Sequence, residues 1–527
     1  MALLYLIVSA FVAYIATSAV YNLFFHPLAK TAGPIICRIS VLPSFYHAIK
    51  GDRHVWIWQN FQRYGNTFRA APNLVLFNTQ RAFVDIYSAR ANTARSGFYR
   101  AWKRNVHDLN TISCTEPALH AKKRKALNLA FTEQSLKIAG PLMAAHIDRW
   151  DELLAGDAAE TWSPPRNMAT WVDFLVFDIL GDLFFGENFN AKEPGENKLK
   201  QIPHLIMRHM RLGYIISKSS LLDLVLFLQP RGLNALQERI RHVDMKAYNS
   251  FVESRVDKRI AAHKAGVESN RHDMFHFLLN AVDPETNLPA YTERHNLLAE
   301  TRLLVLAGTD TSAGTMCGLF FYLAHNPRVL VKLTAEIRST FASVKEIMLS
   351  PKLSRCQYLR ACIDEALRIS PPAPGELPRE VLPGGATIQG RFYPEGTIVG
   401  CAAWSMGRDE TVYGDAGMYR PERWIPSLGE NIVEEEARVR ELKRKFHPFL
   451  MGPGDCAGRN VAMLELLLVC ARTVWRMDIR LAPGCTTGEG KPELGWGQRS
   501  PNQYIVRDSF LCLKDGPVLQ FKQRSEL

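Results

Sequence analysis

The stretch Phe449-Leu-Met-Gly452-Pro-Gly454-Asp-Cys456-Ala-Gly458 places one cysteine in a glycine-rich loop, directly before an apolar helical segment, residues 459–476. A thiolate near a helix start is stabilised by backbone N–H groups and by the positive end of the helix dipole. Gly452, Gly454 and Gly458 carry no side chain, so a flat cofactor can approach the backbone closely. We predict that Cys456 is a metal-bound thiolate whose neighbour Phe449 limits water access; the alternative is a buried cysteine in a turn.

A pair of opposite charges lies upstream of this loop. Glu365 and Arg368 are three residues apart in the helical segment 356–369, so both charges lie on one face. On a solvated surface such a pair contributes little, but the apolar residues around it indicate partial burial. A buried ion pair must be well hydrogen-bonded, and Arg423, about fifty residues further along, is a candidate third member.

The segment Ala307-Gly-Thr-Asp310-Thr311-Ser312 interrupts the otherwise apolar helical pattern of residues 294–325. Gly308 weakens a helix by about 1 kcal/mol relative to alanine. The hydroxyl groups can bond back to the preceding turn, with the glycine serving close packing. The alternative is a groove over an open metal site, in which an acid beside an alcohol passes protons from water toward that site.

Together, these segments resemble the cytochrome P450 family. The cysteine loop resembles the haem-binding pattern F-x-x-G-x-R-x-C-x-G, and Glu365, Arg368 and Arg423 resemble the E-x-x-R and P-E-R-F elements. Residues 307–312 resemble the A/G-G-x-D/E-T-T/S motif. The sequence departs from the family pattern at Gly454, where the family usually carries an arginine that contacts a haem propionate.

The resemblance implies a role for each of these residues. Cys456 would be the axial ligand of a haem b iron, and its sulfur would favour cleavage of the O–O bond. Glu365, Arg368 and Arg423 would form a structural triad under the cysteine loop. Thr311 would order a water beside the oxygen, and Asp310 would feed protons.

Further contacts are implied in the same way. The segment His120-Ala-Lys-Lys-Arg124 resembles the W/H-x-x-x-R helix that reaches the haem propionates, and Arg379 matches a second propionate arginine. Arginine suits these carboxylates because it can form paired hydrogen bonds. Substrate contacts are expected in residues 98–110, 204–228, 303–311 and 373–377, which contain Phe98, Trp102, Leu205, Ile206, Leu304 and Ala307.

Residues 1–25 are predicted to be a transmembrane anchor. Residues 2–25 carry no charged side chain, and about 20 apolar residues span a bilayer. A cleaved signal peptide is the alternative, because Ala16-Thr-Ser-Ala19 resembles a cleavage site, but the apolar stretch is long and no basic residue precedes it. The basic residues that follow favour a single-pass protein whose remaining chain faces the cytosol. The resemblance implies that the membrane is the endoplasmic reticulum, with a proline-containing hinge at 26–40 and a catalytic domain at 41–527.

The rest of the chain has an ordinary globular composition. It has 527 residues, 47% of them hydrophobic and 22% charged, and the ten cysteines form no C-x-x-C pair, which favours reduced thiols. The net charge of +12 suits nucleic acid, an anionic membrane or an acidic protein partner, but no nucleic-acid-binding motif accompanies it. We therefore expect no nucleic acid; the basic residues form either a solvated surface or a docking face for an acidic electron donor.

Helical patterns dominate, so we predict a mainly α fold with small β-sheets, the cytochrome P450 fold, behind one transmembrane helix. An irregular connection is expected at the Pro- and Gly-rich residues 371–383 and a charged surface helix at 430–445. The clearest expected helices are 168–185, 236–263, 294–325, 328–341, 356–369 and 459–476, and the expected strands are 74–77, 386–388 and 397–402.

The resemblance implies a haem-dependent monooxygenase that hydroxylates or otherwise oxidises a lipophilic small molecule, using O2 and electrons from NADPH–cytochrome P450 reductase. The sequence style is similar to that of fungal microsomal enzymes of secondary metabolism, so a terpenoid, polyketide or alkaloid is expected. No G-x-G-x-x-G fingerprint follows a strand, so the reductase is a separate chain. The alternatives are an isomerase or dehydratase without a reductase and a non-catalytic haem-binding membrane protein; Asp310 and Thr311 disfavour both.

Overall fold

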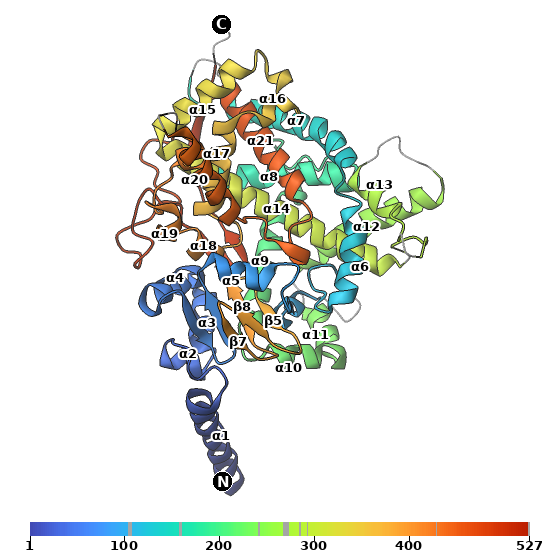
Figure 1. Ribbon diagram of the computed structural model, residues 1–527. Helices are drawn as coiled ribbons and strands as arrows, with labels where there is room; N and C mark the ends of the chain where they lie inside the picture. The colour runs from blue at the N-terminus through green and yellow to red at the C-terminus, as the bar shows by residue number, and fades with distance from the viewer. Residues whose placement is uncertain are drawn as a thin grey trace.

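The computed structural model describes residues 1–103, 108–156, 161–240, 243–266, 273–283, 286–291, 293–427, 429 and 431–524. A large helical region lies above a smaller region that contains the principal sheet, and α1 projects from the lower end (Figure 1). The predicted fold class, mainly α with small sheets, is confirmed.

The helix α14 (Arg294–His325) runs through the centre of the helical region, and most of its residues are buried. A helix that is apolar on nearly all sides must be covered on nearly all sides, which explains its central position. Helices that pack against it include α8 (Met168–Leu180), α17 (Gln357–Ile369) and α21 (Arg459–Arg476) (Figure 1). The predicted bounds of α14 and α21 match the structure.

The other predicted helices differ from the structure mainly at their ends. The predicted helix 168–185 ends in a π-helical turn, η3 (Gly181–Phe185), and 328–341 corresponds to α15 (Pro327–Thr340). The predicted helix 236–263 corresponds to α11 (Leu233–Ile240) and α12 (Val243–Lys264), with residues 241–242 outside the described chain. The predicted surface helix 430–445 is α20 (Ile432–Lys445), with residue 430 outside the described chain.

The remaining helices are short or lie toward the outside. They are α2 (Ile35–Ile39), α3 (Leu42–Lys50), α4 (Arg53–Tyr64), α5 (Gln80–Tyr87), α6 (Pro117–Asn128), α7 (Glu133–Ala155), α9 (Ile202–Ser217), α10 (Leu222–Leu228), α13 (Met274–Leu279), α16 (Pro351–Ser354), α18 (Ala403–Met406) and α19 (Glu410–Tyr413). Short 3-10 helices include η2 (Gly97–Trp102), η7 (Pro421–Trp424) and η8 (Gly452–Gly454).

The principal sheet has five strands in the order β1-β2-β8-β5-β3. Its strands β2 and β8 are parallel, and the other neighbouring pairs are antiparallel. The register of β3 and β5 places Arg95 directly opposite Arg379, which brings two arginines to one edge of the helical region. The strands are β1 (Thr67–Ala71), β2 (Leu74–Phe77), β8 (Ile398–Cys401), β5 (Arg379–Val381) and β3 (Thr93–Arg95).

Three smaller sheets complete the described fold. The pair β10–β11 is an antiparallel hairpin whose turn carries Phe510 at a φ of 72°, a left-handed conformation that bulky residues rarely adopt. The other two sheets are β6-β7 and β4-β12-β9. These strands are β10 (Arg507–Ser509), β11 (Leu511–Leu513), β6 (Ala386–Ile388), β7 (Arg391–Tyr393), β4 (Arg166–Asn167), β12 (Val518–Gln523) and β9 (Met477–Leu481).

The N-terminal helix α1 (Ala2–Val20) has no buried residue and continues into a π-helical turn, Tyr21–Phe25. Two of the described helical segments, Ala2–Phe25 and Arg294–His325, are long and apolar enough to cross a membrane, and a bent pair at 198–231 also qualifies when counted as one segment. The segment Arg294–His325 is mostly buried in the protein core, so Ala2–Phe25 is the candidate anchor.

Two arginines fix the exit of this helix to the body of the protein. Arg38 donates to the carbonyl oxygen atoms of Leu23 at 3.1 Å and Ala29 at 2.8 Å. Arg69 of β1 donates to the carbonyl oxygen of Asn22 at 2.7 Å. The carbonyl groups of Asn22 and Leu23 belong to the last turn of the helix, where no helical partner remains, and that of Ala29 belongs to the turn that follows.

Candidate active site

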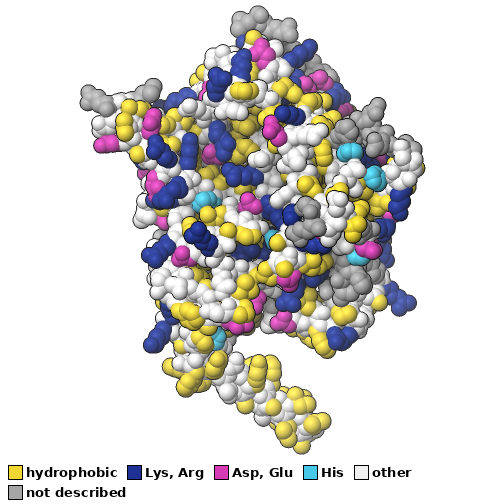
Figure 2. All heavy atoms as spheres, turned by 45° about the vertical axis from the view of Figure 1, so that its right-hand side comes forward, with side chains coloured by type: hydrophobic (Ala, Val, Ile, Leu, Met, Phe, Trp, Pro, Cys, Tyr) yellow, Lys and Arg dark blue, Asp and Glu magenta, His cyan; other side chains and the backbone are white. Residues whose placement is uncertain are grey.

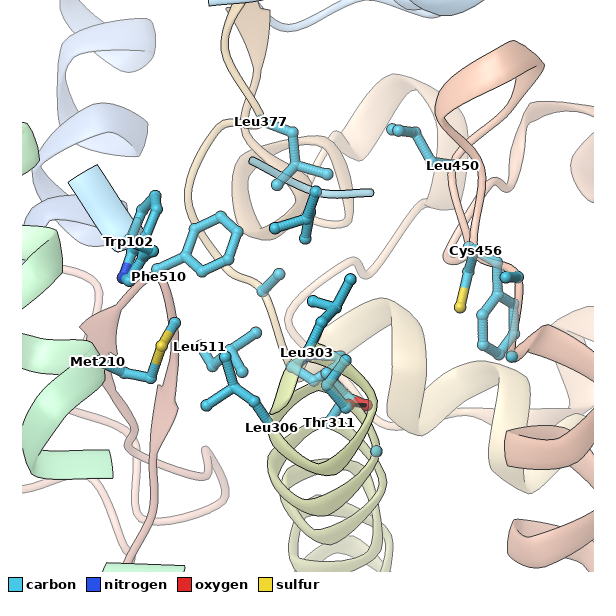
Figure 3. A pocket seen from close by; sticks show the side chains of 18 of the residues that line it. Trp102, Met210, Leu303, Leu306, Thr311, Leu377, Leu450, Cys456, Phe510 and Leu511 are labelled. Carbon is cyan, nitrogen blue, oxygen red and sulfur yellow. Dashed lines mark hydrogen bonds between the residues drawn. The ribbon is translucent and has the colours of Figure 1, made fainter. Parts of the chain in front are cut away.

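A cavity of about 1080 Å³ lies between the cysteine loop and α14. Cys456 lines one wall, and Thr311 of α14 lines another (Figure 3). Of the ten cysteines, eight are buried and Cys485 is partly buried, whereas Cys456 is exposed. Its exposed surface faces the cavity, so this thiol is available to a group bound inside the protein.

Backbone hydrogen bonds shape the cysteine loop. The N–H of Cys456 donates to the carbonyl oxygen of Phe449 at 3.0 Å, and that of Asp455 donates to Gly452 at 3.1 Å. Gly452 has a φ of 68°, and a Cβ there would lie 2.2 Å from the carbonyl oxygen of Tyr87, so only glycine fits. Burial raises the pKa of the Cys456 thiol and a backbone hydrogen bond at Gly458 lowers it, so a positive metal ion would complete the stabilisation of a thiolate.

Four basic side chains gather beside this loop, and they include the predicted residues His120, Arg124 and Arg379. Arg95, which sequence reasoning missed, lies opposite Arg379 in the sheet and lines the cavity together with Arg124. Arg124 donates to the backbone oxygen and, at 2.7 Å, to Oδ1 of Asp455. Arg95 and Arg379 have no carboxylate partner within the described part of the chain.

The charges of this cluster perturb one another. Burial and the positive charges of Arg379 and Arg124 lower the pKa of Arg95 to about 10. Burial and the same neighbours, together with Arg95, lower the pKa of His120 to about 3, so His120 is neutral. Such a cluster suits a ligand that brings carboxylates, because each arginine can form paired hydrogen bonds with one.

The position of Arg379 accounts for the glycine at position 454. A Cβ added to Gly454 would lie 2.0 Å from Nη2 of Arg379, so this guanidinium occupies the space where a side chain at 454 would begin. Arg379 is buried, lies 5.5 Å from the centre of the Tyr87 ring, and leaves its Nε without a hydrogen-bond partner. Arg379 therefore blocks the start of any side chain at position 454, and its guanidinium lies beside the cysteine loop as a positive charge.

Thr311 and Gly308 lie on the cavity face of α14. The Thr311 hydroxyl donates to the carbonyl oxygen of Ala307 at 2.7 Å, so it bonds back to the preceding turn while it lines the cavity. A Cβ on Gly308 would lie 2.9 Å from Cδ2 of Leu180, so the glycine also lets α8 and α14 approach closely. Hydrogen bonding back to the preceding turn and a role in a groove over the metal site are thus compatible for residues 307–312.

Asp310 does not line the cavity. Its side chain is fully buried, with Oδ1 3.8 Å from Nζ of Lys514, and neither carboxylate oxygen has a hydrogen-bond partner. Burial raises the pKa of Asp310 to about 7, although the positive charge of Lys514 opposes the rise. The predicted acid is therefore held near neutrality, but its carboxyl faces away from the Thr311 hydroxyl.

Glu365, Arg368 and Arg423 are brought together by α17 and η7, beside the helix α21 that follows the cysteine loop. All three side chains are almost completely buried. Arg368 donates to both oxygens of Glu365 at 2.8 Å, and Arg423 donates from Nε to Oε1 at 2.9 Å. The indole of Trp424 and the N–H of Arg420 also donate to Glu365, so every acceptor position of this carboxylate is used.

Comparison with known proteins extends these observations. A sequence profile described as Cytochrome P450 matches residues 33–500. The chain belongs to the cytochrome P450 family. Cytochrome P450 monooxygenase apf7 of Gibberella fujikuroi is 33% identical and covers 96% of this chain and 95% of its own. The enzymes poxM of Penicillium oxalicum and fscF of Fusarium equiseti, both cytochrome P450 monooxygenases, are each 31% identical over 98% of this chain, and the alignments cover 94% and 96% of their own lengths.

This cytochrome P450 is a haem-thiolate monooxygenase, a class that uses O2, a redox partner and a lipophilic substrate. Its residues fit the cofactor of the family. The sulfur of Cys456 faces the cavity. Beside the cysteine loop, Arg95, Arg124 and Arg379 supply the positive charge that would bind the two propionate carboxylates of a haem. The haem, when bound, supplies the oxygen and electron chemistry.

Most of the cavity wall is apolar, and several expected substrate contacts lie in it. Phe98 does not line the cavity but packs behind Trp102, with the two ring centres 4.7 Å apart. Residues 104–107 of the predicted range 98–110 lie outside the described chain. Expected contacts that do line the cavity are Trp102, Leu205, Ile206, Leu304, Ala307, Ala373 and Leu377.

Sequence reasoning also missed two parts of this wall. Phe510 and Leu511, at the turn of the β10–β11 hairpin, extend into the cavity beside Trp102 (Figure 3). No local pattern connects this C-terminal hairpin to a site formed by helices. Glu465 of α21 is a buried carboxyl on the wall, and its only sequence signal is a single acidic residue inside an apolar helix.

Proposed function

We propose that this cytochrome P450 hydroxylates or otherwise oxidises a lipophilic intermediate of fungal secondary metabolism, such as a terpenoid, polyketide or alkaloid. The observation that carries this proposal is the cavity itself, in which the Cys456 thiol faces apolar walls and the Thr311 hydroxyl. An apolar pocket with few polar anchors suits such a ligand. The similarity to monooxygenases of Gibberella, Penicillium and Fusarium supports the fungal setting.

Each site residue then has a defined task. Cys456 would ligate the iron of haem b, within the loop that Phe449, Gly452 and Gly458 shape. Arg95, Arg124 and Arg379 bind the propionates, with His120 packed behind them as a neutral ring. Glu365, Arg368 and Arg423 form a rigid support next to the helix that follows the loop.

Two residues of α14 handle protons in this proposal. The hydroxyl of Thr311 would hold a water in the cavity and pass a proton to oxygen that electrons from the redox partner have reduced, and Asp310 would replace that proton. A general acid works best when its pKa lies near the operating pH, which the pKa of Asp310 near 7 satisfies. Because Asp310 faces away from the cavity, its carboxyl must turn or act through water to reach Thr311.

Electrons come from NADPH through NADPH–cytochrome P450 reductase, which docks on a basic surface next to the cysteine loop. This docking surface consists of Lys122 on α6, Arg440 and Lys443 on α20 and Arg459 on α21, all exposed. It adjoins the loop because α20 leads into it, α21 follows it and Arg124 of α6 contacts Asp455. Opposite charges on a partner steer association to such a surface.

Residues 1–25 anchor the protein in the endoplasmic reticulum membrane, residues 26–40 form the hinge and residues 41–527 form the catalytic domain in the cytosol. Exposed apolar side chains on α2, α3 and α10 support contact with lipid at the same end of the molecule (Figures 1 and 2). Contiguous exposed apolar surface marks such interaction sites. These side chains are Ile35, Ile36, Leu42, Tyr46, Leu224 and Phe227.

The test uses full-length protein in lipid nanodiscs with the reductase. A panel of terpenoids, polyketides and alkaloids is screened for the change in iron spin state that reports substrate entry, and binders are incubated with NADPH under ¹⁸O₂. Incorporation of one labelled oxygen atom is expected. Turnover without NADPH would instead support an isomerase or dehydratase, and a reduced carbon-monoxide spectrum like that of haemoglobin would contradict the Cys456 ligand.

A further inference from the structure

Lys514 is a buried lysine that the reaction scheme above does not use. It follows β11, and its side chain is 3% exposed. A buried ammonium group needs anions nearby to offset the lost hydration. Two carboxylates supply them: Oδ1 of Asp173 on α8 lies 2.6 Å from Nζ, and Oδ1 of Asp310 on α14 lies 3.8 Å from it.

These three side chains form a chain of charges that leads from the surface to the interior. The side chain of Asp173 is 21% exposed, whereas that of Asp310 is fully buried, and Lys514 lies between them. Burial lowers the pKa of Lys514, but Asp173 and Asp310 raise it further, so the net pKa is above its ordinary value. Lys514 is therefore a fixed positive charge and not a proton donor at neutral pH.

Asp310 depends on this charge, because no hydrogen bond reaches its carboxylate oxygens within the described chain. Tyr248 and Cys512 also face Asp310, but burial raises the pKa of each, so both stay neutral. Consecutive residues of a helix point about 100° apart, so Thr311 can line the cavity while Asp310 faces Lys514. The orientation of Asp310 is thus the one that an ion pair with Lys514 favours.

We propose that Lys514 is a positioning residue for proton delivery, which holds the Asp310 carboxylate behind α14 and, with Asp173, links it to solvent. The inference rests on the proposed role of Asp310. A proton that leaves the Asp310 carboxyl toward the water beside Thr311 is replaced by a proton from water that enters next to Asp173. The exchange needs no other reagent, and Lys514 keeps its own protons throughout.

The test follows the protonation of Asp310 in full-length, haem-loaded protein. Subtraction of the infrared spectrum of Asp310→Asn identifies the carboxyl band of Asp310, which is then titrated against pH. In Lys514→Met the midpoint is expected to move upward by about one pH unit or more, because a charge that favours the ionised form is lost. Lys514→Arg keeps the charge and is expected to keep the midpoint near the original value. An unchanged midpoint in Lys514→Met would overturn the proposal.

Two controls make the result specific. Lys491→Met removes an exposed lysine of the same C-terminal region, and a shift as large as that of Lys514→Met would also overturn the proposal. If Lys514→Met does not retain haem, the test uses Asp173→Asn instead. Because this variant removes the other carboxylate partner of Lys514, the lysine charge acts on Asp310 alone and the midpoint of the Asp310 titration must fall. An unchanged or raised midpoint would overturn the proposal. The titration needs neither substrate nor reductase, so a failure of NADPH-dependent turnover would contradict the proposed function and leave this result standing.

Discussion

Glu365 is a fully buried carboxylate that accepts hydrogen bonds from two arginine side chains. It accepts from Arg368, Arg423 and Trp424. Burial alone would raise its pKa, but the positive charge and hydrogen bonds of Arg368, the positive charge of Arg423 and the N–H of Arg420 keep the pKa below its ordinary value. A carboxylate this deep is tolerated only because its partners are complete. The same completeness means that the two arginines depend on the single negative charge of Glu365.

Replacing Glu365 with glutamine is therefore expected to destabilise the protein strongly. The change leaves two buried guanidinium groups without their anion, which costs roughly 3–5 kcal/mol of the free energy of unfolding. Chemical denaturation of the holoprotein, followed by circular dichroism and haem absorption, measures the loss. Glu346→Gln, which removes an exposed partner of Lys352, is the matched control and should change little. Equal losses in the two variants would show that the burial of Glu365 is unimportant.

A second carboxyl links stability to pH. Burial raises the pKa of Glu465 to about 7, and the Ser312 hydroxyl lowers it only in part. The folded protein then holds a proton that the unfolded chain releases near pH 4.5, so the stability that this proton provides is present at low pH and declines as the pH rises toward 7.

We expect Glu465→Gln to remove this dependence. Relative to the variant, the original protein should lose roughly 2 kcal/mol of unfolding free energy between pH 5 and pH 8, since one unit of pKa difference corresponds to about 1.4 kcal/mol. Denaturant midpoints of both proteins at the two pH values measure the difference. All other titrating groups are shared, so parallel pH profiles would mean that the carboxyl of Glu465 is not protonated in the folded state.

Some residue positions were readable from the sequence, and others were not. The loop around Cys456 and the Glu365–Arg368 spacing are local patterns, and the structure places those residues as such patterns require. Arg95 has no local signal, because its importance comes from the strand pairing that sets it opposite Arg379. The direction of the Asp310 side chain was also beyond reach, since Lys514, which attracts it, is about two hundred residues away.

At the scale of elements, α14 serves both the packing of the core and the chemistry of the cavity. Gly308 lets it approach Leu180 of α8, and Thr311 presents a hydroxyl to the cavity while it bonds to Ala307. A hydroxyl that accepts and donates at once can hold a water in a fixed place. The position of the helix is thus set by packing, and its chemistry is set by one residue on the cavity face.

Thr311→Ala should uncouple the consumption of NADPH from product formation. Without the hydroxyl, proton delivery becomes disordered, and the ratio of product to NADPH consumed is expected to fall roughly tenfold or more. Simultaneous assays of NADPH, hydrogen peroxide and product measure this ratio. Thr311→Ser keeps the hydroxyl and should restore most of the coupling; a variant Thr311→Ala with normal coupling would contradict the proposed relay.

Helices such as α14 and α21 were predictable because their apolar residues recur at helical spacing over many turns. The principal sheet was only partly predictable. Its strands β2 and β8 were both expected, but their pairing was not, because they lie more than three hundred residues apart in sequence. The strands β3 and β5, of three residues each, were not expected. Pairings of that kind leave no pattern in any short window.

At the scale of the whole molecule, the location of the basic residues matters more than the net charge of +12. The proposed docking surface adjoins the cysteine loop, whereas the apolar side chains of α2, α3 and α10 lie at the end of the protein from which the anchor projects. An anchored partner in the same membrane can then reach the loop from the side while lipid contacts the lower end.

Reversing two charges of the docking surface should therefore impair electron delivery and nothing else. In the double variant Arg440→Glu and Lys443→Glu, the KM for the reductase is expected to rise about tenfold, because steering between opposite charges accelerates association by at least that factor. Titration of reconstituted vesicles with reductase measures the KM. The reduced carbon-monoxide spectrum should be unchanged, since neither side chain lines the cavity.

The matched control reverses the same amount of charge elsewhere. Lys264 on α12 and Lys491 in the segment before β10 are exposed, so Lys264→Glu with Lys491→Glu alters the net charge equally. This control should leave the KM near the original value, and added salt should narrow the gap between the two variants because it screens exposed charges. If both double variants weakened the reductase interaction equally, the partner would be responding to overall charge, and the location of the docking surface beside Cys456 would be wrong.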